Sequence, residues 1–83
     1  MRANVEVLVV SESGQPIGQI LVTAQGPLYR AGRSDNQGKV SLTGLTPGTY
    51  RLRAEGEGVV TLEKELVLKG GPPVSVDFAL AAA

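Results

Sequence analysis

Residues 34–52 read SDNQGKVSLTGLTPGTYRL, and this stretch predicts a turn, a strand, a corner and a second strand in succession. Asp35 to Gly38 can begin a type I turn and end it with a glycine at positive φ, a geometry that leads into a β-hairpin. Pro47 and Gly48 turn the chain again before Tyr50, after which apolar and basic residues alternate. We therefore assign structural roles to Asp35, Gly38, Pro47, Gly48 and Tyr50.

The remaining chain shows the same period of two between glycine- and proline-rich breaks, and no window of ten or more residues has a helical apolar period. The predicted strands cover residues 4–10, 17–25, a short segment within 26–33, 39–43, 48–55, 59–68 and 74–80. Seven short strands separated by turns predict an all-β, seven-stranded β-sandwich without substantial helix.

Three local features add detail to this prediction. Gly18 inside the second strand indicates a bulge or a close backbone approach. A three-residue hairpin loop at 56–58 would place Arg51 opposite Glu63. Lys64 would then fall among inward-facing apolar residues, which requires a bulge or an edge position there.

The composition limits the classes of function. The 83 residues fit one domain, residues 1–83, and the eight basic and eight acidic residues cancel. Neither nucleic acid nor membrane insertion is expected, because no net field or long apolar segment favours them. The N-terminal apolar run is broken by Glu6 and is too short for a signal peptide. Ala81 to Ala83 resembles the edge of a linker, so we expect the domain to have been excised from a larger protein.

Catalysis has little support, because the chain contains no His and no Cys. Glu6 and Asp77 could form a carboxylate pair if the first and last strands were neighbours, but two solvated acids are the simpler interpretation. Lys64 could have a lowered pKa, or its stem could cover the core while its amine reaches water. We expect no enzyme activity, no cofactor and no metal.

A calcium loop is a second reading of Asp35, Asn36 and Gly38. Calcium prefers six to eight oxygen ligands, and no further acid follows until Glu55. The turn interpretation is therefore favoured.

Residues 26–33 form the best candidate for an interface, because Leu28, Tyr29, Arg30 and Arg33 combine apolar, aromatic and basic side chains. The competing interpretation is a loop that packs its own apolar residues onto the core. Sandwich edge strands could also pair with another strand, although the charged run at 63–65 could equally prevent this. We expect a protein partner or neighbouring domains of the parent chain, with a monomer or weak edge-strand self-association.

The turn pattern S-D-x-x-G, followed by G-L-x-P-G-x-Y, is the most specific motif of the chain. With the segments at 5–7, 14–18 and 76–80, it resembles the carboxypeptidase regulatory-like domains, which have the transthyretin (prealbumin-like) fold, a Greek-key sandwich. The resemblance implies a non-catalytic attachment to a larger protein, and favours an extracellular or cell-envelope parent; the sequence itself leaves the compartment open.

Two chemically active relatives can be compared with these residues. Transthyretin-like hydrolases of 5-hydroxyisourate depend on histidines, which this chain lacks, and the similar Tyr29-Arg30-Ala31-Gly32 lies in mid-chain. Collagen-adhesin B-type domains join a first-strand Lys to an Asn or Asp of the last strand; Asp77 is present, but residues 4–10 contain no Lys. We therefore predict an accessory β-sandwich for protein docking or structural spacing, with a carbohydrate- or peptide-binding module of a surface or secreted protein as the alternative.

Overall fold

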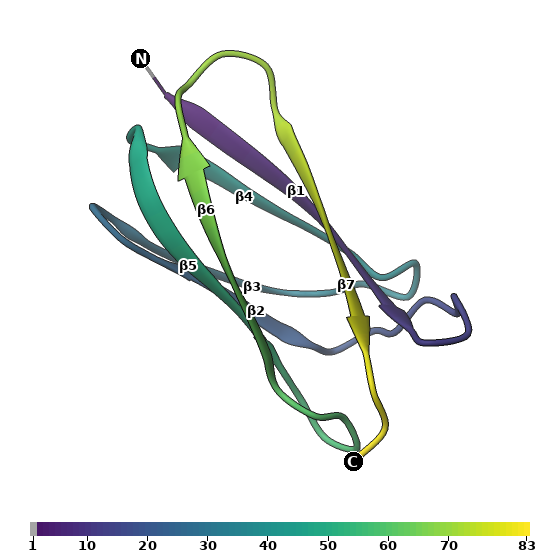
Figure 1. The fold of residues 1–83 in the computed structure, drawn as a ribbon. Coiled ribbons are helices and arrows are strands. Elements are labelled where there is room, and N and C mark those ends of the chain that lie inside the picture. The colour runs from purple at the N-terminus through teal and green to yellow at the C-terminus, as the bar shows by residue number, and fades with distance from the viewer. Residues whose placement is uncertain (1) are drawn as a thin grey trace.

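The computed structural model describes residues 2–83, which form seven strands in two facing sheets and no helix (Figure 1). The strands are β1 (Ala3–Ser11), β2 (Leu21–Gln25), β3 (Tyr29–Arg33), β4 (Lys39–Leu45), β5 (Gly48–Glu55), β6 (Leu62–Leu68) and β7 (Val74–Leu80). One sheet has the order β4-β1-β7 and the other β3-β2-β5-β6. The predicted seven-stranded sandwich is confirmed. Among the residues described, no helix is long and apolar enough to cross a membrane.

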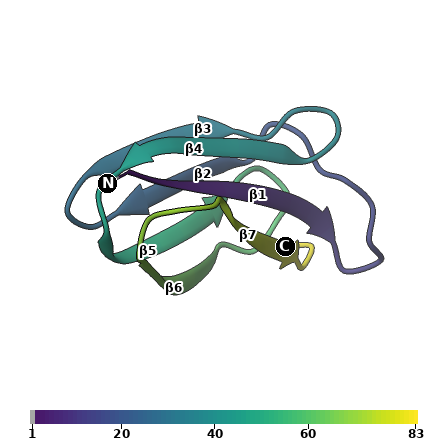
Figure 2. The same cartoon turned by 90° about the horizontal axis from the view of Figure 1, so that it is seen from above.

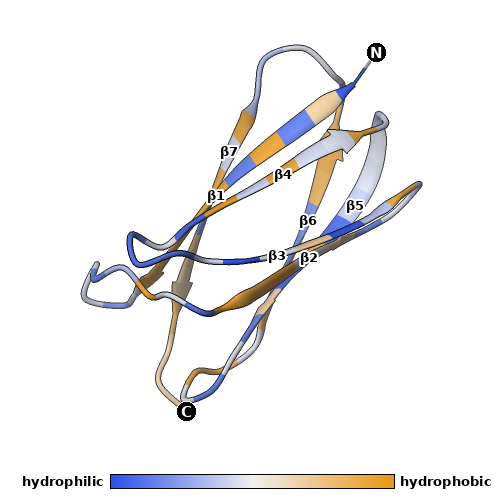
Figure 3. Ribbon diagram, turned by 180° about the vertical axis from the view of Figure 1, so that it is seen from behind, coloured by the Kyte–Doolittle hydropathy of each residue, from blue (hydrophilic) through white to orange (hydrophobic). Residues whose placement is uncertain are grey.

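The core is the space between the sheets, and alternation along each strand fills it. The buried members of β1 are Ala3, Val5, Val7 and Val9, which alternate with polar or half-buried residues, visible as coloured bands in Figure 3. The opposite sheet contributes Val22, Ala24, Tyr50, Leu52 and Ala54. A side chain on a strand points to the opposite face from its neighbours, so this period of two places one apolar face of each sheet inside.

The chain enters the sandwich at one end and leaves it at the other. β1 pairs with β7 in parallel, from Val5 opposite Val74 to Ser11 opposite Leu80, whereas every other strand pair is antiparallel. Because the first and last strands run in the same direction, the two termini lie at opposite ends of a molecule measuring 36 × 19 × 16 Å (Figure 1).

The sandwich has two open sides, where the edge strands of the two sheets approach each other. β3 runs along β4 on one side, and β6 and β7 occupy the opposite side (Figure 2). Within residues 2–83, no ladder joins a named strand of one sheet to a named strand of the other, and the only backbone link between these edges is the bridge of Val59 with Ala82 beyond the ends of β6 and β7. Side chains from the edge strands must therefore close both openings.

The second predicted strand was too long, because residues 17–20 do not pair as a strand. Ser34 holds this segment instead: its buried Oγ accepts a hydrogen bond from the Ile20 N–H at 2.9 Å and donates one to the Ile17 carbonyl at 2.7 Å. Gly18 approaches the Asp35 backbone closely, since a Cβ there would lie 3.0 Å from its carbonyl oxygen. The close approach, rather than a bulge, explains this glycine.

The predicted pairing of β5 with β6 was wrong by two residues. Arg51 lies opposite Glu65, and Arg53 lies opposite Glu63. The connection runs from residue 56 to 61 rather than through a three-residue loop, because its second half pairs elsewhere. The Val60 N–H donates to the Ala81 carbonyl at 2.8 Å, and the Ala83 N–H donates to the Gly58 carbonyl at 3.1 Å. The end of the chain is therefore tied to the start of β6.

Candidate functional site

The predicted interface loop is largely an edge strand, because residues 29–33 form β3 and only residues 26–28 connect it to β2. Leu28 is half-buried and packs against the core. The apolar signal was weak here because the inward positions of β3 are Arg30 and Gly32. The structure thus separates the four candidate residues into two inward and two outward positions.

Arg30 points towards the open side between β3 and β4. Its Nε donates to the Thr43 carbonyl at 3.2 Å, and its Nη2 donates to the Gly44 carbonyl at 3.3 Å. Nη1 donates to the carbonyl of Tyr29 at 2.9 Å. The guanidinium thus links the edges of both sheets, which accounts for its position without a partner.

Tyr29 and Arg33 lie on the outer face of β3, with Ala31 between them. Tyr29 is 57% exposed, and the Arg33 guanidinium donates a long hydrogen bond of 3.4 Å to the Gln19 carbonyl. Four residues of strand separate the two side chains by about 13 Å. These two residues are the accessible part of the predicted interface.

The outer face of the four-stranded sheet continues from β3 with alternating charge. Arg53 contacts Glu55 at 3.4 Å and Glu63 at 4.0 Å, and all three side chains are well exposed. Exposed pairs of this kind contribute only about 0.2 to 1 kcal/mol. This face therefore offers polar and charged groups to solvent rather than a single-sign patch.

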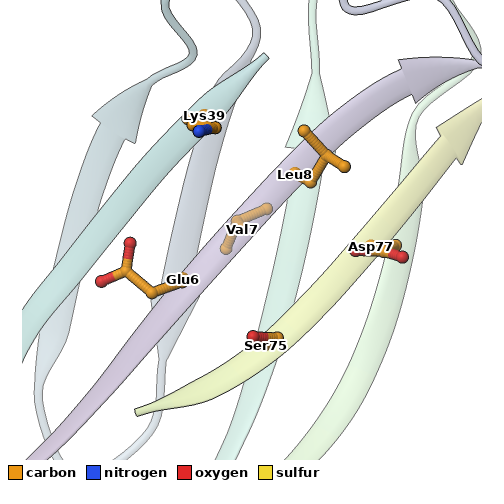
Figure 4. A pocket seen from close by; sticks show the side chains of 6 residues that line it. All are labelled: Glu6, Val7, Leu8, Lys39, Ser75 and Asp77. Carbon is orange, nitrogen blue, oxygen red and sulfur yellow. The ribbon is translucent and has the colours of Figure 1, made fainter. Parts of the chain in front are cut away.

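The opposite outer face carries a shallow hollow of about 240 Å³ across β4, β1 and β7 (Figure 4). Leu8 lies between Lys39 and Asp77, its register partners on the neighbouring strands. Glu6 is one row away, and its carboxylate accepts a hydrogen bond from Ser41 at 2.6 Å. Glu6 and Asp77 are thus on neighbouring strands, as the pair hypothesis required, but both are exposed and in different rows.

An isopeptide bond to Asp77 would need a lysine on the first strand opposite it. That residue is Leu8, which has no amine. Lys64 is the lysine that reaches Asp77, and its ammonium donates to the backbone carbonyl of Asp77 rather than to the carboxylate.

Lys64 closes the second open side of the sandwich. It points inward from the edge strand β6, as its sequence position suggested, and its ammonium lies 5.2 Å from the centre of the buried Phe78 ring. A cation over an aromatic face is attracted by the ring quadrupole. Arg30 and Lys64 therefore have matching positions, one on each edge strand of the four-stranded sheet.

The Asp35 carboxylate accepts its hydrogen bonds from backbone groups of its own turn. Its Oδ1 accepts hydrogen bonds from the N–H groups of Lys39 at 2.9 Å and Gln37 at 2.8 Å, and the Gly38 N–H donates to the Asp35 carbonyl. These donors, Lys39 first, hold the pKa of the Asp35 carboxyl below its ordinary value of 3.8. Among residues 2–83, no three His, Cys, Asp or Glu side chains gather as metal ligands.

The corner after β4 is built around Tyr50. Its ring is buried, and its hydroxyl donates to the Thr46 carbonyl at 2.8 Å, on the other side of Pro47. Gly48 begins β5 and lies against Pro27 of the preceding connection. This arrangement anchors the corner to the core.

Several residues with clear roles were not singled out from the sequence. Ser34 carries a local signal, since it directly precedes Asp35 of the turn, but its partners lie fourteen and seventeen positions away. Leu8 gave no signal, because its role depends on which strands become neighbours. Residues 81–83 were interpreted as the edge of a linker, but they pair with residues 58–60 through backbone hydrogen bonds.

Comparison with solved structures shows the fold in several larger proteins. The Bacillus anthracis TIE protein matches with a TM-score of 0.85 and 13% identity, over 98% of this chain and 16% of that chain. A streptococcal ancillary pilin matches with a TM-score of 0.80 and 16% identity, over 99% and 33%. The 3-chlorocatechol 1,2-dioxygenase of Rhodococcus opacus 1CP matches with a TM-score of 0.80 and 13% identity, over 99% and 60%.

These structures share the sandwich at identities that carry no functional information, and this chain spans less than two thirds of each of them. No curated protein matches the sequence significantly. The family comparison is more specific, because the model of the carboxypeptidase regulatory-like domain matches residues 4–81. The chain therefore belongs to the carboxypeptidase regulatory-like domain family.

Proposed function

We propose that this domain is a non-catalytic accessory module that spaces and docks neighbouring domains within a larger protein. The observation that carries the proposal is the position of the termini at opposite ends of a molecule 36 Å long. A domain with this geometry can be inserted between two others and hold them apart. Its family membership and the occurrence of a similar fold as one part of longer chains support the same role.

Two features favour spacing and docking over catalysis. The hollow over Leu8 is open, and its two carboxylates lie in different rows of the sheet, flanked by exposed Lys39 and Ser75. General acid–base chemistry needs groups held within hydrogen-bond reach of one substrate atom, usually in a site that excludes water. The dioxygenase shares the fold at 13% identity, which transfers no chemistry to this chain.

Docking would use the outer edge formed by Tyr29 and Arg33. Tyr29 and Arg33 are the first and last outward residues of β3, and exposed aromatic and arginine side chains are enriched at protein interfaces. Arg30 is excluded from this surface because its guanidinium is bonded to β4. The proposed docking surface therefore includes Tyr29 and Arg33 but not Leu28 or Arg30.

A domain exchange in the parent protein tests spacing against docking. Deletion should impair the parent, and insertion of an unrelated β-sandwich with termini at opposite ends should restore it if spacing alone matters. If only this domain restores function, and Tyr29→Ala or Arg33→Ala abolishes the rescue, docking is the role. A parent protein that tolerates deletion without loss would contradict both roles.

The structure also suggests a control for the docking test. Arg30→Met should lower stability through loss of its contacts with Thr43 and Gly44, and it leaves both outward side chains, Tyr29 and Arg33, in place. If Tyr29→Ala abolishes partner binding at unchanged stability and Arg30→Met retains binding, the interface lies on the outer face. The reverse pattern would contradict this assignment.

Exposure of Tyr29 also favours the second candidate, a carbohydrate-binding module. The other two aromatics of the chain, Tyr50 and Phe78, are buried, so stacking would depend on one ring. Titration with oligosaccharides, monitored through the resonances of Tyr29, tests this function. Saturable shifts of Tyr29, together with shifts of the neighbouring Ala31 and Thr23 amides that are lost in Tyr29→Ala, would support it over protein docking.

A further inference from the structure

The first and last strands of this domain form the direct path between its termini. β1 and β7 are neighbours, and seven consecutive residue pairs join them, from Val5 opposite Val74 to Ser11 opposite Leu80. Tension applied to the two termini pulls β1 towards its beginning and β7 towards its end (Figure 1). Because the strands are parallel, these pulls are opposed, and the strands must slide along each other to separate.

Sliding loads the whole ladder at once. The hydrogen bonds of a sheet lie across its strands, so a force along the strands is shared by all the bonds between β1 and β7. A force that opens the same pair from one end instead breaks the bonds one after another. The first geometry gives the higher barrier to unfolding, which is the quantity that forced unfolding measures.

Side-chain packing adds to the cost of sliding. Val7 and Val9 of β1 and Phe78 of β7 are buried on the inner face. A slip of one residue turns these side chains to the opposite face, and a longer slip moves them out of register with the core. On its other edge β1 is held by β4, so the pulled N-terminal strand lies in the centre of its sheet.

The outer edge of β7 is secured at two places. The Lys64 ammonium holds the Asp77 carbonyl and lies over the Phe78 ring. Beyond β7, residues 81–83 pair with residues 58–60 through two backbone hydrogen bonds. These contacts keep the exit of the chain in line with β7, so that the pull follows the strand axis.

We propose that this domain is a load-bearing link, in which β1 and β7 form a clamp that resists tension between the termini. The proposal rests on the proposed spacer function, because the termini carry tension only if neighbouring domains are attached to both of them. The clamp itself is a property of the 83 residues. The resistance of the clamp to force can therefore be tested on these residues alone, whatever the parent protein does.

The chain has no Cys, so introduced cysteines provide unique attachment points for single-molecule pulling. Arg2→Cys with Ala83→Cys pulls along the clamp. Arg2→Cys with Pro73→Cys pulls the same two strands apart from one end, because residue 73 directly precedes β7. Both variants retain every pair of the ladder, and denaturant unfolding should show equal stability.

We expect the first pair to need at least about twofold more force at the same pulling rate, because the bonds of the ladder are loaded together. Equal forces for two variants of equal stability would overturn the clamp. The result does not depend on the domain exchange described above: a strong clamp in a dispensable domain would contradict only the proposed function.

A second comparison isolates Lys64. Lys64→Met keeps the apolar stem and removes the ammonium, and Lys69→Met makes the same change at an exposed lysine just after β6. With attachment at residues 2 and 83, we expect Lys64→Met to lower the unfolding force and Lys69→Met to leave it unchanged. Equal forces for the two variants would overturn the role assigned to Lys64.

Discussion

Ser34 is the residue on which the least regular part of the chain depends. Its hydroxyl both accepts from the Ile20 N–H and donates to the Ile17 carbonyl, and the side chain is buried. A buried backbone group left without its partner costs about 1 to 3 kcal/mol. This hydroxyl adds two bonds to the three backbone bonds that hold residues 17–20, which join Ile17 to Val9 and both Gln19 and Ile20 to Ser34.

We predict that Ser34→Ala lowers the free energy of unfolding by about 1 to 3 kcal/mol, because the Ile20 N–H loses its acceptor. Chemical denaturation monitored by circular dichroism measures the change. Ser75→Ala, on the exposed face of β7, serves as the control and should change stability by less than about 0.5 kcal/mol. Similar losses in the two variants would show that Ser34 has no special role.

Asp35 makes the stability of the turn depend on pH. Hydrogen bonds from the N–H groups of Lys39 and Gln37 lower its pKa from 3.8 in the native state. The unfolded chain therefore takes up this proton first as the pH falls. The stabilising contribution is complete above about pH 3.8 and is lost as the pH falls through the lowered native pKa.

We predict that Asp35→Ala is less stable than the unmodified protein at neutral pH, and that its stability falls less steeply below about pH 4. Unfolding midpoints measured from pH 2 to 7 test this. Asn36→Ala in the same turn should keep the acid dependence. Identical pH profiles for the Asp35 variant and the unmodified protein would contradict the assignment.

At the scale of elements, the turn before β4 packs directly on β1. The Val9 N–H donates to the Gly38 carbonyl at 2.7 Å, and a Cβ on Gly38 would lie 2.3 Å from the Val9 carbonyl oxygen. Gly38 also has a φ of 77°, in the left-handed region. Both the conformation and the contact require glycine.

Gly14 provides a matched comparison, because its φ is 90° but its Cβ position is open. We predict that Gly14→Ala costs about 1 to 2 kcal/mol, the cost of a left-handed residue. Gly38→Ala should cost clearly more, since the Val9 backbone must also move. Denaturant unfolding of both variants measures the difference, and equal losses would contradict the steric contact.

The elements differ in how far their sequences determine them. The bounds of β5 and β7 were predicted from alternation between clear breaks, because both strands have one apolar and one polar face. β3 was not resolved, because Arg30 and Gly32 occupy its inward positions. The predicted register between β5 and β6 was wrong because residues 58–60 form hydrogen bonds with residues 81–83, a contact that no local pattern encodes.

The candidate interface illustrates the same limit. Composition identified Leu28, Tyr29, Arg30 and Arg33 together, but only strand geometry separates the two outward residues from the two inward ones. Lys64 was the opposite case, because its parity with inward apolar residues already predicted a bulge or an edge position, and β6 is an edge strand. An inward charge on an edge strand also discourages pairing with another chain.

For the whole molecule, the opposed termini predict how copies joined in tandem will behave. We predict that two copies joined directly extend by about one long axis, 36 Å, relative to one copy. Small-angle X-ray scattering gives the maximum dimension of each. A tandem no longer than a single domain would show that adjacent copies fold back on each other, contrary to a spacer.

The pairing of β1 with β7 also determines when the domain can be completed during translation. β1 is made first, but its partner on one edge is the last strand to be synthesised. At about 5 to 20 residues per second, β1 remains unpaired on that edge for several seconds. The nascent chain therefore exposes a valine-rich strand until β7 has left the ribosome, and premature termination before Val74 would leave a fragment open to aggregation.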